Sequence, residues 1–387
     1  MTLPANWLAL GALIITASLI GTSLAFTYPL FALALENAGT SADLIGLNAA
    51  MSALAIFVIA PWLPRIVGTL GLLPAIAVGM VIYAGALLFC PLEVDVWLWS
   101  ALRFVMGLGM ALSWVATETA VNAIADDRIR GRVMGVYATV FCVGYALGPI
   151  VISVTGSAGW LPFLVAAGVA LVSLLPLLLV SGVQQALGHV GSTGLLTVLA
   201  IAPVALGASL VFGFAETTSF TLLPLYGLAQ GYQPSGAALL LTVLIAGNVL
   251  LQIPIGWLGD RRGRVPVLIL CAVLGALTVI SWPFTLADPW IGWPLLLLGG
   301  GLLGGMYTLS LATLGERFKG SDLAVANTAF VTLYQIGAMV GPPLGGFAMG
   351  RLGADGLPLV VTFALAGFVA VAIVSRRRAG VGIAGEA

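Results

Sequence analysis

Charged residues are scarce in this sequence: they make up 7% of its 387 residues, whereas 61% are hydrophobic. Soluble domains contain roughly 25% charged and 45–50% apolar residues. Water cannot solvate so apolar a chain, which excludes a soluble globular protein and indicates one embedded in lipid. The formal net charge is zero, so nothing in the composition indicates a nucleic-acid partner.

The residues that build metal sites and hydrolytic centres are also rare. The three cysteines (Cys90, Cys142 and Cys271) have spacings that suit neither a metal site nor a disulfide framework, and the only histidine is His189. The sequence contains no His-Glu-x-x-His, no Gly-x-Ser-x-Gly and no Gly-x-x-x-x-Gly-Lys-Ser/Thr. We therefore expect neither an enzyme nor an ATP-driven pump, and no metal or cofactor.

Long apolar segments are what the sequence has in abundance. A membrane span needs about 20 mostly apolar residues, and its backbone must satisfy its hydrogen bonds internally. The pattern predicts twelve helical spans and no removed signal peptide. They cover residues 7–33, 43–63, 70–90, 96–122, 132–155, 160–181, 196–228, 236–258, 265–285, 290–313, 324–350 and 357–375.

Lysine and arginine predict the orientation in the membrane. Twelve of the fourteen lie in alternate connections or the C-terminal tail, whereas the opposite connections hold only Arg351. The positive-inside rule then places both termini in the cytoplasm, which requires an even number of spans. We expect a multi-pass protein of the cell (inner) membrane.

The two halves of the chain repeat each other. YPLFALA at Tyr28 matches LPLYGLA at Leu223, PWLPRIVGT at Pro61 matches GWLGDRRGR at Gly256, and GYALGP at Gly144 matches GAMVGP at Gly337. Parallel six-helix repeats are typical of transporters. We predict an N-terminal six-helix bundle (1–180), a cytoplasmic linker (181–195), a C-terminal bundle (196–375) and a cytoplasmic tail (376–387).

These features together resemble the major facilitator superfamily over nearly the whole chain. Its loop motif, Gly-x-x-x-Asp-Arg-x-Gly-Arg, is met by Gly256, Asp260, Arg261, Gly263 and Arg264. The copy in the first half is degenerate, with Arg65 in place of the aspartate. Arg-x-x-x-Gly at Arg103 and Gly-x-x-x-Gly-Pro (Gly144, Gly148 and Pro149) resemble motifs of proton-coupled drug exporters, and the run from Thr117 to Pro149 resembles small bacterial permeases. The resemblance implies an all-α fold, with twelve helices in two pseudo-symmetric bundles around a central cavity.

Glu216 lies midway along the seventh predicted span. A charge at the bilayer centre costs about 2.5–3.5 kcal/mol on insertion scales, and such residues face a cavity or a partner. The resemblance implies that the first, fourth, seventh and tenth helices line the cavity. We therefore predict that Glu216 couples transport to protons or binds a cationic substrate; the alternative is a protonated glutamate in a structural hydrogen bond.

Arg103 is the other charge inside a predicted span. Trp114 and Glu118 share its helix face at 3.6 residues per turn. We predict that Arg103 either stabilises the charged form of a neighbouring acid or binds an anionic substrate. The alternative is that its side chain extends to the outer interface. For Glu118 we predict a gating salt bridge with Arg128, Arg130 or Arg132; the alternative is contact with the substrate.

The loop motif predicts a cytoplasmic gate. A carboxylate is stabilised at a helix N-terminus, and the resemblance implies a latch between the halves when the cytoplasmic side is shut. We predict that Asp260 caps the fifth span, near Gly131, in the outward-facing state; the alternative is a solvated loop charge.

Other residues are candidates for packing or for the cavity. Small residues let membrane helices approach closely, which predicts helix packing at Gly144, Gly148, Pro149, Gly341 and Pro342. Polar and aromatic residues of the spans predict a mixed cavity, although each alone is more often a helix–helix contact. They are Asn48, Trp114, Tyr137, Tyr145, Asn248, Tyr307, Tyr334 and Gln335.

The sequence thus favours a monomeric secondary transporter that binds a small molecule and protons in a lipid bilayer and works by alternating access. Export of amphipathic or cationic compounds in exchange for protons is the leading hypothesis. Import of a small metabolite is the second, and a non-transporting sensor or scaffold on the same fold is the third.

Overall fold

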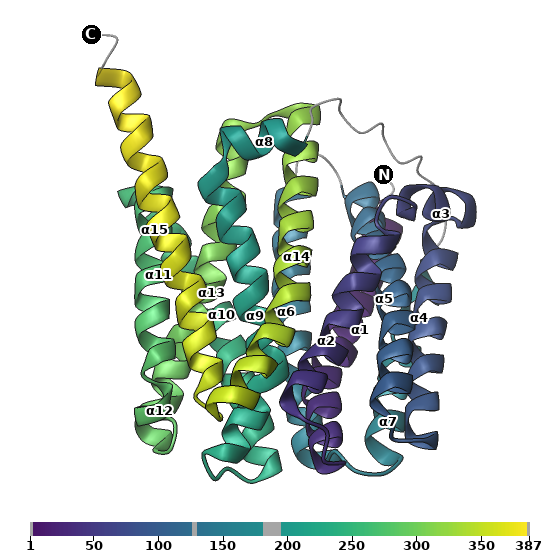
Figure 1. The fold of residues 1–387 in the computed structure, drawn as a ribbon. Helices are drawn as coiled ribbons and strands as arrows, with labels where there is room; N and C mark the ends of the chain where they lie inside the picture. The colour runs from purple at the N-terminus through teal and green to yellow at the C-terminus, as the bar shows by residue number, and fades with distance from the viewer. Residues whose placement is uncertain (1–2, 126–129, 181–194, 385–387) are drawn as a thin grey trace.

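The computed structural model describes residues 3–125, 130–180 and 195–384, and every regular element in these ranges is a helix (Figure 1). The first half of the chain forms α1 (Leu3–Asn37), α2 (Ala42–Ile59), α3 (Leu63–Leu70), α4 (Leu72–Phe89), η1 (Cys90–Leu92), α5 (Val96–Ile124), α6 (Arg130–Thr155), α7 (Leu161–Val172) and η2 (Leu175–Leu179). The second half forms α8 (Leu195–Ile201), α9 (Pro203–Ala229), α10 (Pro234–Arg262), α11 (Arg264–Ile280), α12 (Trp282–Thr285), α13 (Pro289–Arg317), α14 (Gly320–Leu352) and α15 (Gly356–Ala384).

Each of the twelve predicted spans corresponds to a long helix or a helix pair. Ten helices within the described ranges are long and apolar enough to cross a bilayer, and α11 is a shorter apolar helix of the same kind. The remaining span, predicted at 324–350, is α14. The predicted all-α membrane fold is confirmed.

The helix ends differ from the predicted spans where prolines interrupt them. The span predicted at 196–228 is broken at Ala202, because Pro203 begins a new helix at its first position. In the span predicted at 160–181, α7 ends at Val172 and the short 3₁₀ helix η2 follows from Leu175, because Pro176 cannot donate a backbone hydrogen bond. The predicted linker falls almost wholly on residues 181–194, outside the described ranges.

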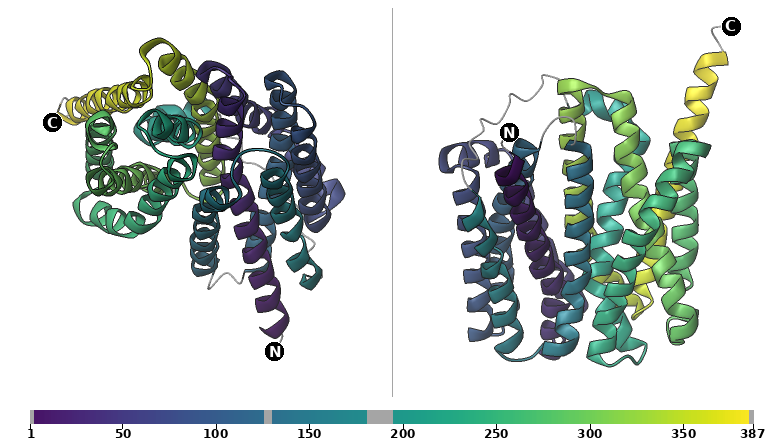
Figure 2. Two further views of the ribbon diagram at one scale, coloured as in Figure 1. Left: turned by 90° about the horizontal axis from the view of Figure 1, so that it is seen from below. Right: turned by 180° about the vertical axis from the view of Figure 1, so that it is seen from behind.

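The two halves lie side by side as two bundles, the first purple to blue and the second teal to yellow (Figures 1 and 2). Their glycine motifs serve equivalent contacts. Gly144 lets α6 approach the backbone of α1 at Ser18, and Gly337 lets α14 approach the backbone of α9 at Leu210. The repeat between GYALGP and GAMVGP is therefore a repeat of helix packing, as close-packed small residues in membranes allow.

Both termini lie on one side of the molecule, together with α3 and α8 (Figure 1). We call this the inner side, following the positive-inside prediction, and the opposite side the outer side. The outer ends of the bundles touch where Gly46 of α2 meets the backbone of Pro342 and Gly346 of α14 meets the backbone of Ala42. A Cβ added at Gly346 would lie 2.1 Å from the Ala42 carbonyl oxygen.

Side chains at the interface of the bundles are more buried towards the outer side than towards the inner side. Every residue of α9 from Thr217 to Gly227 is buried, although this stretch forms the outer half of a membrane-spanning helix. Towards the inner side, Glu118 and Trp114 of α5 are exposed, the latter by 38%. The structure is therefore closed on the outer side and accessible from the inner side.

Candidate functional site

Glu216 lies at the middle of α9 and is partly buried. The hydroxyl of Tyr334 on α14 donates a hydrogen bond of 2.6 Å to its Oε2 atom. The carboxyl group is also close enough to Tyr28, Tyr145 and Tyr307 to interact electrostatically with their hydroxyls. One tyrosine thus contacts the carboxyl group, and three more, from helices of both bundles, lie in its wider surroundings.

Aromatic rings close this group of tyrosines on the outer side. Phe220, one helical turn beyond Glu216, is 3% exposed. Its ring lies 5.7 Å from that of Tyr28 and 5.6 Å from that of Tyr145, both in the N-terminal bundle. Phe220 therefore spans the interface between the bundles and separates Glu216 from the outer side.

A small cavity lies directly against Glu216. Its walls include Phe212, Leu244 and Asn248, and its volume of about 10 Å³ is room for about one water molecule. A charged group beside a hydrated space can exchange a proton more readily than one in a dry helix contact. Proton exchange at Glu216 stays a prediction.

Polar and aromatic side chains continue from Glu216 towards the inner side. Tyr307 lies close enough to both Glu216 and Glu118 for an electrostatic interaction with each carboxyl group, and Tyr137 lies close enough to Glu118 for the same kind of interaction. The side chain of Trp114 contacts both Glu118 and Phe141, the latter at a ring distance of 5.0 Å. This series of residues connects the midplane carboxyl group with the accessible inner side.

Arg103 lies beside Tyr28 in the N-terminal bundle and is 3% exposed. Its Nη1 atom donates a 3.0 Å hydrogen bond to Oδ1 of Asn48, and its guanidinium carbon lies 4.7 Å from the Phe31 ring centre and 5.8 Å from that of Tyr28. The side chain does not extend to the outer interface. Tyr28 lies near both Arg103 and Glu216. The predicted electrostatic effect of Arg103 on the Glu216 carboxyl group stays a prediction.

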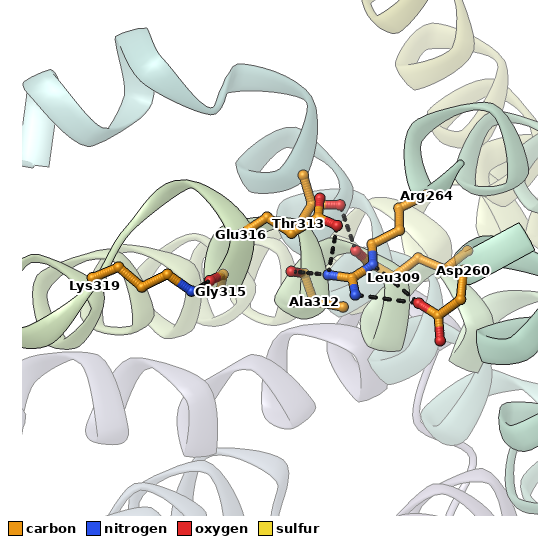
Figure 3. A network of polar contacts seen from close by, with 8 residues as sticks. All are labelled: Asp260, Arg264, Leu309, Ala312, Thr313, Gly315, Glu316 and Lys319. Carbon is orange, nitrogen blue, oxygen red and sulfur yellow. Dashed lines mark hydrogen bonds and ion pairs between the residues drawn. The ribbon is translucent and has the colours of Figure 1, made fainter. Parts of the chain in front are cut away.

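The loop motif forms a network within the C-terminal bundle (Figure 3). Arg264 pairs with Asp260 at 3.2 Å and with Glu316 at 3.2 Å, and its Nη1 atom donates a 2.5 Å hydrogen bond to the Ala312 carbonyl. Gly263 has a φ of +89° and reverses the chain between α10 and α11. Arg264 thus fastens this turn to α13.

In this inward-accessible state Asp260 faces Arg264. The predicted cap on α6 concerns the outward-facing state and stays a prediction. The Arg261 guanidinium stacks on Trp257 at 3.9 Å. Glu118 forms no ion pair with Arg132, although both are described; Arg128 and the side chain of Arg130 lie outside the described residues, so the gating salt bridge also stays a prediction.

The remaining candidates fall into three groups. Asn48 is fully buried within the N-terminal bundle and donates a hydrogen bond to Ser100, away from the cavity beside Glu216. Asn248 lines that cavity, whereas Gln335 is half-buried on α14. The packing residues Gly148 and Gly341 lie against α1 and α9 within their own bundles, whereas Pro342 contacts the other bundle.

Sequence reasoning did not select Tyr28, Phe212 or Phe220 as site residues. Tyr28 belongs to the repeat between YPLFALA and LPLYGLA, and this repeat was the one signal that could have found it. Phenylalanines in an apolar helix are indistinguishable from core residues without the neighbouring helices.

The sequence matches the family model described as "Major Facilitator Superfamily" over residues 13–245 and 205–382. The chain belongs to the major facilitator superfamily. An uncharacterized MFS-type transporter of Enterobacter sp. strain 638 is 31% identical over 268 residues, which cover 67% of this chain and 68% of the relative. YfkF of Bacillus subtilis, also described as an MFS-type transporter, is 25% identical over 91% of this chain and 92% of its own length.

Solved structures of the superfamily share the fold. A mutant form of the nucleoside transporter NupG has a TM-score of 0.81 at 12% identity, covering 95% of this chain and 99% of its own. A bacterial homologue of the human lysosomal transporter Spinster, in an inward-facing and unoccupied conformation, has a TM-score of 0.76 at 14% identity over 96% of both chains. The protein is therefore a multi-pass membrane transporter of the superfamily.

Proposed function

We propose that this superfamily member exports amphipathic or cationic compounds in exchange for protons, with Glu216 as the group that binds either one. The observation that carries the proposal is the single carboxyl group among four tyrosines at the interface of the bundles. Aromatic rings attract cations through their faces, and the carboxylate supplies the opposite charge.

Competition at one carboxylate produces exchange. A proton and an organic cation cannot both neutralise Glu216, so binding of one releases the other. On the inner side a cation replaces the proton, and on the outer side a proton replaces the cation. Because the bundles alternate around this site, each cycle moves one species in each direction.

The inner part of the pathway suits a partly apolar cation. Trp114, Phe141, Tyr137 and Tyr307 provide rings on both bundles. Glu118 adds a second carboxyl group near the inner end, where it is exposed. Rings and acids together attract planar or lipophilic cations and disfavour anions, although Arg103 nearby offers a positive charge behind Tyr28.

Import of a small metabolite is the second candidate. The likeness in fold to the nucleoside transporter NupG favours it, because tyrosine hydroxyls and Asn248 can also hydrogen-bond an uncharged polar ring. Under this alternative Glu216 would bind a proton together with the substrate instead of exchanging one for the other.

Flux measurements in proteoliposomes distinguish these candidates. Tetraphenylphosphonium is the cationic probe and radiolabelled uridine the neutral one, each tested with and without an imposed pH gradient. We expect the gradient to drive tetraphenylphosphonium against the proton flow and to leave uridine unmoved. Uridine moving with protons would favour import, and no flux of a broad panel of probes would favour a sensor.

A further inference from the structure

A second carboxyl group lies at the inner end of the interface between the bundles. Glu118 belongs to the last two turns of α5, which ends at Ile124, and its side chain is exposed. Tyr137 of α6 lies close enough to Glu118 for an electrostatic interaction, and so does Tyr307 of α13 in the other bundle. Because helices of both bundles supply these neighbours, Glu118 belongs to the interface and not to the lipid-facing surface.

An accessible aromatic ring lies beside this carboxyl group. Trp114, one turn before Glu118 on the same helix, contacts the carboxyl group and is 38% exposed. The indole meets the ring of Phe141 edge-on at 5.0 Å, which holds it in place between α5 and α6. An accessible indole next to an accessible carboxylate offers an organic cation both a ring face and an opposite charge.

A stack of rings connects the surroundings of Glu118 with those of Glu216. On α6, Tyr137 stacks on Phe141 at 6.4 Å, and Phe141 stacks on Tyr145 at 5.7 Å. Tyr137 is the ring near Glu118, and Tyr145 is the ring near Glu216. Eight residues of helix separate the first ring from the last, which is about 12 Å along the helix axis. One continuous stack therefore has a carboxyl group near each end.

We propose that Glu118 and Trp114 form a second binding site for organic cations, at the inner entrance, which a substrate occupies before it reaches Glu216. The choice of an organic cation as the occupant rests on the proposed function. The stack from Tyr137 to Tyr145 keeps ring faces in contact with a lipophilic cation as it leaves one carboxylate for the other. Binding at Glu118 releases no proton from Glu216, so the entrance collects substrate before exchange begins.

The test measures equilibrium binding of radiolabelled tetraphenylphosphonium to the purified full-length chain in detergent. Glu216→Gln removes the central carboxylate, and we expect this variant still to bind the probe. Adding Glu118→Gln to it should weaken binding by about tenfold or more, because a cation then loses its only close charge partner. Adding Trp114→Ala to Glu216→Gln instead should weaken binding about threefold through loss of the ring face.

Matched variants separate a binding role from a structural one. Glu118→Asp keeps the charge and should retain most of the binding. Glu316→Gln changes another exposed glutamate of the inner side, and Trp62→Ala another exposed tryptophan, and both should leave binding unchanged. In proteoliposomes of the otherwise unaltered protein, Glu118→Gln should raise the KM for tetraphenylphosphonium and change kcat little, since the lost interaction precedes the exchange step.

Three results would overturn the entrance site. The first is a Glu216→Gln protein that binds no tetraphenylphosphonium. The second is an affinity of Glu216→Gln that neither Glu118→Gln nor Trp114→Ala changes. The third is a Glu118→Gln protein with an unchanged KM and a lower kcat, as loss of a gating salt bridge would give.

Failure of this site is distinguishable from failure of the proposed function. Binding that depends on Glu118 without any transport of the probe would keep the entrance site and contradict cation export. Proton-driven transport of the probe without such binding would keep cation export and contradict the entrance site. Absence of binding in every variant and in the unaltered protein would overturn both.

Discussion

At the scale of single residues, the surroundings of Glu216 come from several helices, its own included. Tyr334 donates to its carboxylate at 2.6 Å, and Phe220 separates it from the outer side. A hydrogen bond to a charged group contributes about 1.5–3 kcal/mol. Loss of that bond should therefore be measurable in transport, because under the proposed function the same carboxylate binds protons and substrate in turn.

Tyr334→Phe removes only the donated hydrogen bond and keeps the ring. We expect tetraphenylphosphonium flux in proteoliposomes to fall by about 10–150-fold, which corresponds to about 1.5–3 kcal/mol. Tyr83→Phe is the matched control, since Tyr83 is buried within the N-terminal bundle with its hydroxyl near Thr27. Equal flux in both variants and the unaltered protein would show that Tyr334 does not act on Glu216.

The sequence identifies charged site residues and misses their aromatic partners. Glu216 and Arg103 stand out because charges are costly in a span. Phe212, Phe220 and Tyr28 do not, because an aromatic residue fits an apolar span equally well as a core, lipid-facing or cavity residue. Asn48 shows the converse: its polarity predicts a cavity, but the structure uses it to hydrogen-bond Arg103.

At the scale of helices, α2 and α14 close the outer side through direct backbone contact. Gly346 permits this contact, because any side chain there would meet the Ala42 carbonyl at 2.1 Å. A larger residue at this position should keep the outer side open and slow the cycle.

We predict that Gly346→Leu reduces transport at least about tenfold and exposes the outer half of the interface. The reporter is Phe220→Cys in a background without the three native cysteines, labelled by a membrane-impermeant thiol reagent from outside. Labelling should rise in Gly346→Leu. Gly350→Leu, one turn further along α14, is the control, since its added Cβ meets nothing within 4 Å. Equal labelling in both would contradict this closing contact.

The turn between α10 and α11 supplies a second prediction about an element. Asp260 and Glu316 both pair with Arg264 in the inward-accessible state, and both are largely exposed. Exposed ion pairs contribute at most about 1 kcal/mol to stability. Replacing either Asp260 or Glu316 by its amide should therefore change the stability of the protein little. The predicted latch on α6 involves only Asp260.

Asp260→Asn should therefore favour the inward-accessible state and reduce outside labelling of Phe220→Cys. Glu316→Gln removes the other partner of Arg264 and should leave that labelling unchanged. If the two variants behave alike, Asp260 serves only the network around Arg264 and the latch is wrong.

Helix positions were predictable because a bilayer imposes a length of about 20 apolar residues. All twelve spans therefore have a counterpart among the helices. The break at Ala202 and the 3₁₀ turn η2 were not predicted, because proline is tolerated within membrane helices, as Pro149 within α6 illustrates. Which proline interrupts a helix depends on neighbouring helices that one sequence does not reveal.

At the scale of the whole molecule, two repeated bundles meet around one carboxyl group. The repeat in the sequence predicted two similar bundles, and Gly144 and Gly337 make equivalent helix contacts within the two halves. The conformational state could not be predicted, because both states use the same helices and differ only in which ends touch. Alternating access then requires the outer contacts to separate as the inner ends close.

Proton-coupled flux through Glu216→Gln tests the central claim most directly. Glutamine keeps the shape and loses the exchangeable proton. In proteoliposomes with an imposed pH gradient, we expect this variant to lose uphill tetraphenylphosphonium transport and its accompanying proton flux, measured with an entrapped pH dye. Glu316→Gln, remote from the site, is the control and should retain both. Uphill transport and proton flux at unaltered rates in Glu216→Gln would contradict the account.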